Sequence, residues 1–433
     1  MVFPPAQEQD PSGPIGPAAA ALRAGRLVAV ADSPDRESEV DLVLAAQTAG
    51  SRTVAAMVRH GSGFLCAAMA AGDLDRLALP PMAAVNEDPH GTAYAVSCDA
   101  AEGIGTGISA ADRARTLRVL ADPASGRRDL RRPGHVVPLQ ARPGGVLERA
   151  GHTEAAVDLA RAAGLVSAAA IVELVEDDGS MLRHRNWPRY AAERGLSDVP
   201  LITVEELAEW RRRTERHVQQ LEAAQLPTAS GTWRVSAWRD AVTGEDHLAM
   251  VLGDVTDGWP VLVRVHSECL TGEALRSLRC DCGPQLDAAQ SQIAAEGRGI
   301  IVYLRGHEGR GIGLAAKIAA YARQDAGADT VEANLALGLP SDGRRYHAAG
   351  QILTALGVRE VRVLTNNPAK TTELAAHVSV VSRQPLVTAI TVQNRHYLAT
   401  KRDRMDHDLP DPLGPALTPP VPARPLPAPA ATP

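Results

Sequence analysis

The segment HSECLTGEALRSLRCDCGPQ, residues 266–285, holds three of the chain's five cysteines, at Cys269, Cys280 and Cys282. Clustered thiolates favour a soft divalent ion, and zinc is the commonest such ion in proteins. Three protein ligands leave the fourth tetrahedral position to water, whose pKa zinc lowers toward neutrality. The segment therefore predicts a catalytic zinc site that delivers hydroxide to an electrophilic carbon.

A structural zinc site is the alternative, and it requires a fourth protein ligand. His266 stands three residues before Cys269 and has a suitable side chain. The spacing alone leaves both readings open, and they differ in chemistry because a closed site holds no water.

The bulk composition is that of a globular protein. With 433 residues the chain is long enough for two or three domains, each with its own core. The formal net charge of -6 provides no overall basic field that would attract nucleic acid. Residues 1–16 do not resemble a signal peptide, and no apolar run approaches membrane-spanning length. Together with free cysteines committed to a metal, these features predict a cytoplasmic protein.

An acidic segment, DRESEVD at residues 35–41, follows a predicted buried strand at 27–31. Its four carboxylates stand at alternate positions, so an extended backbone would bring them to one face. Their repulsion would favour a bound divalent cation. A solvated acidic turn is the alternative.

Two histidines follow glycines farther along, at His135 and His152. Arg149 and Thr153, on either side of His152, offer a guanidinium fork and a hydroxyl to a phosphate. His152 itself is suited to ligate a metal or to move a proton. Ser109 is a plausible N-cap for a helix that begins next to it.

Residues 22–213 resemble 3,4-dihydroxy-2-butanone-4-phosphate synthase in the order and number of their motifs. The resemblance implies a magnesium-dependent conversion of ribulose 5-phosphate that releases formate, with manganese as a possible substitute. It implies that Glu37 and His152 bind the metal and that His135 and Glu173 transfer protons. It also implies that Arg36, Asp41, Arg149 and Thr153 bind ribulose 5-phosphate. The matching segments are 35–37, 62–66, Asn86, 92–93, 106–113, 132–135, 151–154, Glu173 and 177–179.

The acidic segment departs from the family pattern Glu-Asn-Glu-Gly-Asp, because Ser38 and Val40 replace the asparagine and the glycine. If the glycine serves a positive φ, Val40 is strained there, and the loop that carries Glu37 and Asp41 is displaced. This predicts a weakened N-terminal activity. Gly105 and Glu176 also replace a usual threonine and a usual asparagine.

Residues 264–407 resemble GTP cyclohydrolase II. The motifs are Cys-x10-Cys-x-Cys, EGRGIG at 308–313, Asp-x-Arg at 342–344 and TNNP at 365–368. The resemblance implies zinc-dependent opening of the GTP imidazole ring, with release of formate and pyrophosphate and with magnesium as a further cofactor. It implies Asp342 as general base, Arg344 as nucleophile toward the α-phosphate and Tyr321 as proton donor. The expected GTP-binding residues are Arg264, Glu268, Gln285, Glu308, Arg310, Thr330, Thr365 and Lys370.

Arg345 departs from this second pattern, because it stands where the family usually has an acidic residue. A second cation beside Arg344 would ease proton loss from its guanidinium or hold another phosphate oxygen.

The sequence thus predicts a mixed α+β and α/β fold with two domains, each a β-sheet with packed helices. They span residues 18–204 and 229–408, joined by a helical linker at 205–228 and flanked by a disordered lead (1–17) and a proline-rich tail (409–433). The predicted function is a bifunctional, homodimeric enzyme of riboflavin precursor synthesis. Two alternatives remain: GTP cyclohydrolase activity beside a degenerate N-terminal domain, and a zinc-stabilised nucleotide-binding regulator without turnover.

Overall fold

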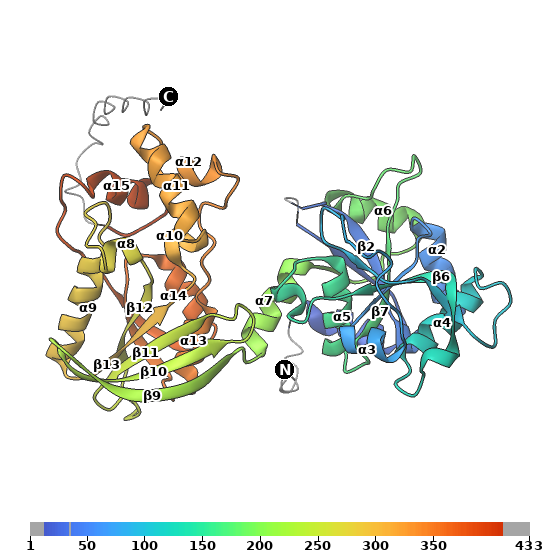
Figure 1. Ribbon diagram of the computed structural model, residues 1–433, viewed down its shortest axis with the longest axis horizontal. Helices are drawn as coiled ribbons and strands as arrows, with labels where there is room; N and C mark the ends of the chain where they lie inside the picture. Colours follow the sequence, from blue (N-terminus) through green and yellow to red (C-terminus); the bar gives the residue numbers. More distant parts are fainter. Residues whose placement is uncertain (1–12, 34–35, 410–433) are drawn as a thin grey trace, which may run out of the picture. The chain divides into compact units, whose positions relative to one another are not determined.

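The computed structural model describes residues 13–33 and 36–409, which form two compact units that meet between Arg216 and His217. Each unit holds one β-sheet with helices packed on it (Figure 1). The predicted fold class is confirmed. Among the described residues, no helix is both long and apolar enough to cross a membrane.

The N-terminal unit is built on an eight-stranded mixed sheet with the strand order β4-β6-β3-β7-β2-β1-β8, and β5 pairs with β6. Its strands are β1 (Val28–Ala31), β2 (Val40–Ala45), β3 (Cys66–Met69), β4 (Ala93–Tyr94), β5 (Cys98–Ala100), β6 (Leu130–Gln140), β7 (Ala168–Glu173) and β8 (Leu201–Thr203). Its helices are α1 (Ile15–Arg23), α2 (Ser51–His60), α3 (Ala71–Arg76), α4 (Ala110–Ala121), α5 (His152–Ala162), α6 (Trp187–Arg194) and α7 (Val204–Thr214).

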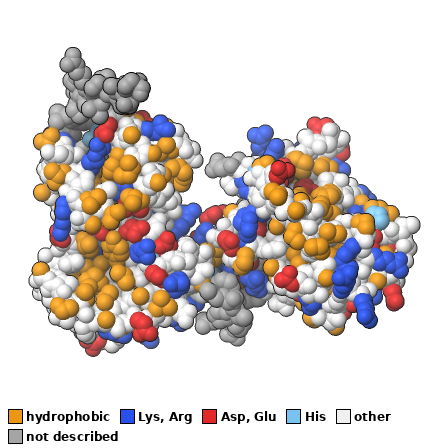
Figure 2. Space-filling model, viewed as in Figure 1, with side chains coloured by type: hydrophobic (Ala, Val, Ile, Leu, Met, Phe, Trp, Pro, Cys, Tyr) orange, Lys and Arg blue, Asp and Glu red, His pale blue; other side chains and the backbone are white. Residues whose placement is uncertain are grey.

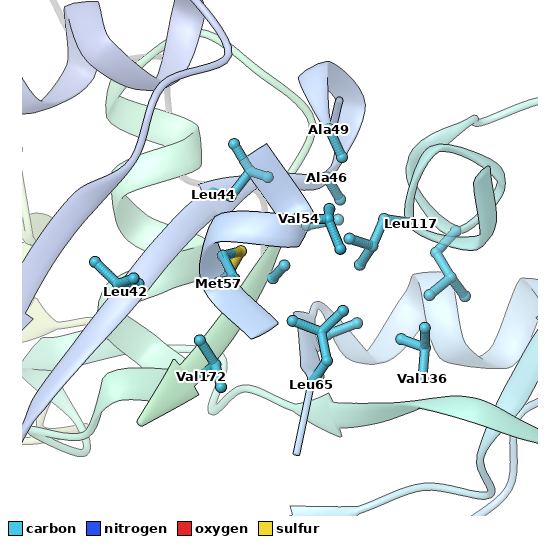
Figure 3. Close-up of a cluster of buried hydrophobic side chains, with 14 of the residues drawn as sticks. Leu42, Leu44, Ala46, Ala49, Val54, Met57, Leu65, Leu117, Val136 and Val172 are labelled. Carbon is cyan, nitrogen blue, oxygen red and sulfur yellow. The ribbon is translucent and has the colours of Figure 1, made fainter. Parts of the chain in front are cut away.

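This sheet is covered on both faces, which explains why its strands read as continuous apolar runs. Leu42 and Leu44 of β2 point into one core with Met57 of α2 and Leu117 of α4 (Figure 3). The intervening Val43 joins a second core, formed with α1, α5 and α7. Side-chain alternation along one strand therefore supplies both cores.

The C-terminal unit has a seven-stranded sheet with the order β15-β14-β12-β13-β11-β10-β9. Strands β12 to β15 pair in parallel, and β9, β10 and β11 add an antiparallel wing. The strands are β9 (Val218–Thr228), β10 (Gly231–Asp240), β11 (Asp246–Leu252), β12 (Val261–Ser267), β13 (Gly299–Leu304), β14 (Glu360–Leu364) and β15 (Ser379–Gln384). The helices are α8 (Leu270–Glu273), α9 (Cys282–Glu296), α10 (Glu308–Gly311), α11 (Leu314–Asp325), α12 (Thr330–Leu335), α13 (His347–Ala355), α14 (Pro368–Leu374) and α15 (Arg395–Arg404).

Two cores again lie on opposite faces of the sheet. Val263 of β12 packs with Ile352 of α13, whereas Leu262 packs with Ile293 of α9. On the face shown in Figure 2, acidic and basic side chains are interspersed over both units.

The predicted helical linker at 205–228 is wrong in its second half. Helix α7 ends at Thr214, and residues 218–228 form strand β9, which pairs with β10. The alanines and glutamines of this stretch favour helix, but the ladder to a neighbouring strand overrides that weak preference.

The predicted end of the disordered lead, at residue 17, is also wrong. Helix α1 begins at Ile15, whose side chain is buried. Residues 1–12 of the predicted lead and residues 410–433 of the predicted tail (409–433) lie outside the described residues.

Candidate active sites

In the N-terminal unit, the predicted site residues gather at one end of the sheet. Asp41 of β2 is the register partner of Glu173 at the end of β7, and Asp32 directly follows β1 beside them. His135 lies on β6 at the same end, but β3 separates that strand from β7. The topology thus brings Asp41 and Glu173 together and leaves His135 two strands away.

A cluster of Asp32, Glu37 and His152 has the geometry of a metal site, because its ligand atoms all lie within 4.8 Å of one another. The Asp32 carboxylate accepts hydrogen bonds from the amides of Glu37 (3.2 Å) and Glu39 (2.8 Å), which curls the acidic segment around it. Glu37 and His152 were predicted as ligands, but Asp32 was not. Asp32 precedes the acidic segment in the sequence. It joins the cluster only because the backbone turns and brings Glu37 back beside it, and the sequence pattern did not predict that turn.

His152 is prepared to act as a ligand. It is the first residue of α5, it is buried, and its Nε2 has no hydrogen-bond partner among the described residues. Burial lowers the pKa of His152, which favours the neutral imidazole that binds metals. A buried nitrogen without a hydrogen-bond partner costs free energy. A metal ion bound to His152 Nε2 would remove that cost.

Asp41 is similarly buried, with its Oδ1 3.7 Å from His152 Nδ1 and without a hydrogen-bond partner among the described residues. Burial, and then the Glu173 carboxylate, raise the pKa of Asp41 well above its usual value. A cation bound between these groups would relieve that cost.

The other predicted residues surround this cluster. Arg36 pairs with Asp32 and Glu37, each at 2.9 Å. Arg149 pairs with Glu154 at 2.6 Å, and Thr153 is buried in the first turn of α5. Glu173 accepts a hydrogen bond from Ser62 (2.8 Å).

His135 has its own carboxylate partner. Its Nδ1 lies 2.7 Å from Asp99 Oδ2, and its amide donates to Asp99 Oδ1 at 2.9 Å. Asp99 was not predicted, because the pairing of β5 with β6 is irregular here: Cys98 lies opposite Val136, whereas Asp99 lies opposite Arg131.

The predicted strain at Val40 is wrong. Val40 is the first residue of β2, pairs with Ala31 and is fully buried. The positive φ falls instead on Ser38, at 56°. The acidic loop therefore turns two residues earlier than the glycine of the family pattern suggested, where serine replaces asparagine.

The two other departures are accommodated by local hydrogen bonds. The Gly105 amide donates to Asp112 Oδ1 (3.1 Å), and Glu176 pairs with Arg189 (2.6 Å).

In the C-terminal unit, Cys269, Cys280 and Cys282 come together at the ends of two elements. Cys269 follows β12, and the other two lie at the start of α9, so that all three sulfurs lie within 4.8 Å of one another. The Cys280 and Cys282 thiols, and then the charge of Lys317, lower the pKa of Cys269. Thiolate is the form that binds metals.

His266 is not a fourth ligand in this arrangement. Its Nε2 lies 3.0 Å from Glu273 Oε1, and its ring stacks on Tyr303 at 5.7 Å between centroids. The metal-binding cluster found among the described residues holds the three cysteines without it. In this arrangement the side chain of His266 contacts Glu273 and Tyr303, whereas the three sulfurs form the cluster.

Lys317 of α11 ties the cysteines to the glycine-rich turn. Its Nζ donates to Cys269 Sγ (3.2 Å), Thr271 Oγ1 (2.8 Å) and Glu308 Oε1 (2.5 Å). The Tyr321 hydroxyl lies 3.1 Å from Thr271 Oγ1, so the predicted Glu308 and Tyr321 meet through Thr271 and Lys317. Neither Lys317 nor Thr271 was predicted.

A pocket opens beside the cysteines. Its lining includes the predicted residues Glu268, Arg310, Tyr321, Thr330 and Arg344, together with His307, Lys317 and Tyr397.

Arg310 is the unusual group in this pocket, because neither of its Nη atoms has a hydrogen-bond partner among the described residues although the side chain is buried. A buried, unpaired guanidinium is costly, which makes it suited to an anion.

Arg344 is bound to Asp342 in a bidentate ion pair, with Nε to Oδ1 at 2.9 Å and Nη2 to Oδ2 at 2.5 Å. Against the effect of burial, Tyr346 and Asp342 raise the pKa of Arg344, and Arg344 lowers the pKa of Asp342. The pair thus stabilises both charges, which opposes the predicted proton transfer between them. The adjacent Arg345 side chain is exposed.

Four predicted GTP-binding residues lie behind the pocket lining. Arg264 donates to Gln285 Oε1 (2.6 Å) and to the Leu364 carbonyl (2.9 Å). Lys370 donates to the Val265 carbonyl (2.8 Å), and Thr365 accepts from the Asn367 amide (3.0 Å). All four are buried, so nucleotide contacts to them would require these bonds to be exchanged.

Comparison with known proteins gives the same division of the chain. The family model for 3,4-dihydroxy-2-butanone 4-phosphate synthase matches residues 17–210, and that for GTP cyclohydrolase II matches residues 219–385. The riboflavin biosynthesis protein RibBA of Salinispora arenicola is 54% identical over 396 residues, covering 91% of this chain and 94% of its own. RibBA of Mycobacterium marinum is 54% identical over 399 residues, covering 90% and 93%.

A solved two-domain 3,4-dihydroxy-2-butanone 4-phosphate synthase from A. baumannii, named RibBX, is 29% identical with a TM-score of 0.62, covering 86% of this chain and 99% of its own. The two enzyme families are metal-dependent, and each unit here has one side-chain cluster suited to a metal. The chain therefore belongs to the family of bifunctional riboflavin biosynthesis proteins, enzymes that join a 3,4-dihydroxy-2-butanone 4-phosphate synthase to a GTP cyclohydrolase II.

Proposed function

We propose that the cyclohydrolase reaction takes place in the pocket beside Cys269, Cys280 and Cys282, which hold a zinc ion. The observation that supports this most directly is the position of three clustered thiols and the unpaired Arg310 guanidinium on one pocket. Bound zinc would supply an activated water for attack on the imidazole carbon of GTP. The buried cations at the same pocket fit the triphosphate.

The residues of the chain then have separable roles. Arg310 and Arg344 bind phosphate oxygens, with Asp342 holding the Arg344 fork in place. Glu308 keeps Lys317 against the Cys269 sulfur, and Thr271 positions the Tyr321 hydroxyl as a proton donor. The ion pair with Asp342 favours the charged form of Arg344. We therefore propose that Arg344 stabilises the leaving pyrophosphate as a cation and does not act as a nucleophile. Arg264, Glu268, Gln285, Thr330, Thr365 and Lys370 complete the proposed nucleotide site.

We propose that the synthase reaction takes place at Asp32, Glu37 and His152, which hold magnesium. The ion would stabilise the enediolate form of the sugar phosphate. Arg149 and Thr153 bind the phosphate of ribulose 5-phosphate, and Arg36 and Asp41 bind its hydroxyl groups. Glu173 and His135 transfer protons, each held by a polar partner, Ser62 and Asp99 respectively.

The experiment that tests the zinc assignment compares two variants of the full chain. Cys280→Ser is expected to lose bound zinc and formate release from GTP, while formate release from ribulose 5-phosphate continues. His266→Ala is the matched change beside the motif and is expected to retain zinc, because His266 contacts Glu273. Zinc is measured by atomic absorption, and equal loss of zinc in both variants would contradict an open three-cysteine site.

We also propose a homodimer in the reducing cytoplasm. Large apolar side chains at Phe64, Met82, Val85 and Ile108 are between 47% and 73% exposed, which suits burial against a second copy. The five free cysteines fit a reducing compartment. Light scattering on the purified chain tests the dimer, and the mass of one chain would contradict it.

A further inference from the structure

Helix α15 (Arg395–Arg404) lies beyond the 219–385 range that matches GTP cyclohydrolase II, yet it reaches the pocket. Figure 1 shows α15 at the end of the C-terminal unit that also holds α8 and α12. Residues 398–401 of this helix are buried, so α15 is packed against the unit.

Ion pairs from two residues attach α15 to two other parts of the C-terminal unit. Lys401 Nζ lies 3.2 Å from Oδ1 of Asp281, the buried residue between Cys280 and Cys282. Arg404 pairs with Asp329 and, at 3.4 Å, with Glu332.

The second of these anchors reaches α12. Asp329 is the N-cap of this helix, and its Oδ1 accepts hydrogen bonds from the amides of Val331 (2.7 Å) and Glu332 (2.9 Å). Thr330 and Asn334 of α12 line the pocket. Helix α15 therefore contacts both the residue between Cys280 and Cys282 and the helix that carries Thr330 and Asn334.

Tyr397 is the residue that α15 contributes to the pocket lining, beside Arg310, Arg344 and the cysteines. The Lys401 ammonium lies 4.4 Å from the centre of its ring and occupies one of its faces. Burial raises the pKa of Tyr397, and Cys282, Asp281 and Cys280 add to that rise while Arg310 opposes it. The side chain is thus close both to the cysteines and to the unpaired guanidinium.

Tyr397 lines the same pocket as the cysteines, Arg310 and Arg344, so it is within reach of a nucleotide whose imidazole carbon meets the cysteines and whose phosphates meet the two arginines. We propose that Tyr397 contacts bound GTP between the imidazole ring and the α-phosphate, and that Lys401 and Arg404 are positioning residues that hold Tyr397 there. This inference rests on the proposed placement of GTP. An aromatic ring offers a rigid contact surface to the ribose and base at little entropic cost.

The test measures GTP and ribulose 5-phosphate turnover on the same full-length samples. Tyr397→Ala is expected to raise KM for GTP about tenfold or more, whereas Tyr397→Phe keeps the ring and stays within about threefold of wild type. Zinc content and ribulose 5-phosphate turnover are expected to remain at wild-type values. His396→Ala is the matched control, because His396 is exposed on the same helix. A KM for Tyr397→Ala within twofold of wild type would overturn the proposal.

A second measurement needs no variant. Hydrogen exchange of residues 395–404 in the zinc-loaded wild-type chain is compared with and without a GTP analogue that carries a methylene between its α- and β-phosphorus atoms. Slower exchange with the analogue is expected, and unchanged exchange while the analogue protects α12 would overturn the contact. If wild type releases no formate from GTP and no exchange slows anywhere in the pocket, the proposed GTP site itself fails.

Discussion

At the scale of single residues, the acidic segment of the synthase site shows how register decides which side chain is strained. A letter-by-letter comparison with the family pattern predicts that Val40 is the misfit. The pairing of Val40 with Ala31 places it in regular strand, where a β-branched side chain is favoured. Ser38 has the positive φ. The pattern of apolar residues does not predict a left-handed backbone conformation at a single residue.

Replacing Ser38 by the asparagine of the family pattern, and Val40 by its glycine, is therefore expected to change the stability of the N-terminal unit in opposite directions. Ser38→Asn is expected to stabilise the N-terminal unit by up to about 1 kcal/mol, because asparagine tolerates the left-handed region better than serine. Val40→Gly is expected to destabilise it by about 2 to 4 kcal/mol, through lost burial and added backbone entropy. Urea unfolding followed by loss of ribulose 5-phosphate turnover measures both. A gain in stability or turnover from Val40→Gly would restore the strained-valine hypothesis.

Three residues that the sequence did not predict each contact a predicted residue or segment. Asp32 accepts from the amides of the acidic segment, Asp99 holds His135, and Lys317 joins Cys269 to Glu308. Their side chains have no distinctive spacing, because strand pairing and helix packing bring them in from elsewhere. The three cysteines were predictable because ligand type and spacing are local properties of the sequence.

At the scale of elements, helix starts were easier to predict than helix ends. Ser109, predicted as an N-cap, begins α4, and a capping box of Thr203 and Glu206 begins α7. The end of α7 at Thr214 depends on β9 joining β10, a contact whose partner strand lies farther along the chain. Local chemistry thus defines the first boundary, and tertiary pairing defines the second.

Helix α7 is held to the N-terminal unit by a buried ion pair. Arg211 Nη1 donates to Asp158 Oδ2 of α5 (2.7 Å) and to the Gly144 carbonyl (2.8 Å), and both charged side chains are 1% exposed. Gly145, next to that carbonyl, has φ 60°, and a Cβ there would lie 2.2 Å from the Asp158 carboxylate. The close approach of carboxylate and guanidinium to this backbone leaves no room for a side chain at Gly145.

Arg211→Met is expected to destabilise the N-terminal unit by about 3 to 5 kcal/mol, because it leaves the buried Asp158 carboxylate with only the more distant, partly exposed Arg161 at 3.5 Å. The double change with Asp158→Asn is expected to recover much of that loss. Arg189→Met is the control, since Arg189 is 51% exposed in its pairs with Glu176 and Glu193, and should cost below about 1 kcal/mol. Urea unfolding of the full chain, followed by ribulose 5-phosphate turnover, measures all three, and equal effects of Arg211→Met and Arg189→Met would contradict the role of burial.

At the scale of the whole molecule, the two units divide the chemistry as well as the chain. In the part of the chain that the structure describes, each has its own sheet, its own pair of cores and one cluster of side chains suited to a metal. The ligand types differ: oxygen and imidazole donors in the N-terminal unit, three thiols in the C-terminal unit. Hard oxygen donors favour magnesium or manganese, whereas thiolates favour zinc.

After the metals are removed, each reaction is therefore expected to recover when its own metal is added back. Dialysis of the full chain against a chelator should abolish formate release from both GTP and ribulose 5-phosphate. Magnesium alone should then restore the ribulose 5-phosphate reaction, and GTP turnover should return only when zinc is also added. Glu37→Gln provides the reciprocal control, because it replaces an anionic carboxylate of the first cluster with a neutral amide and should leave GTP turnover at the wild-type rate. Recovery of GTP turnover with magnesium alone would show that the three thiols are not the site of the required metal, whatever their spacing.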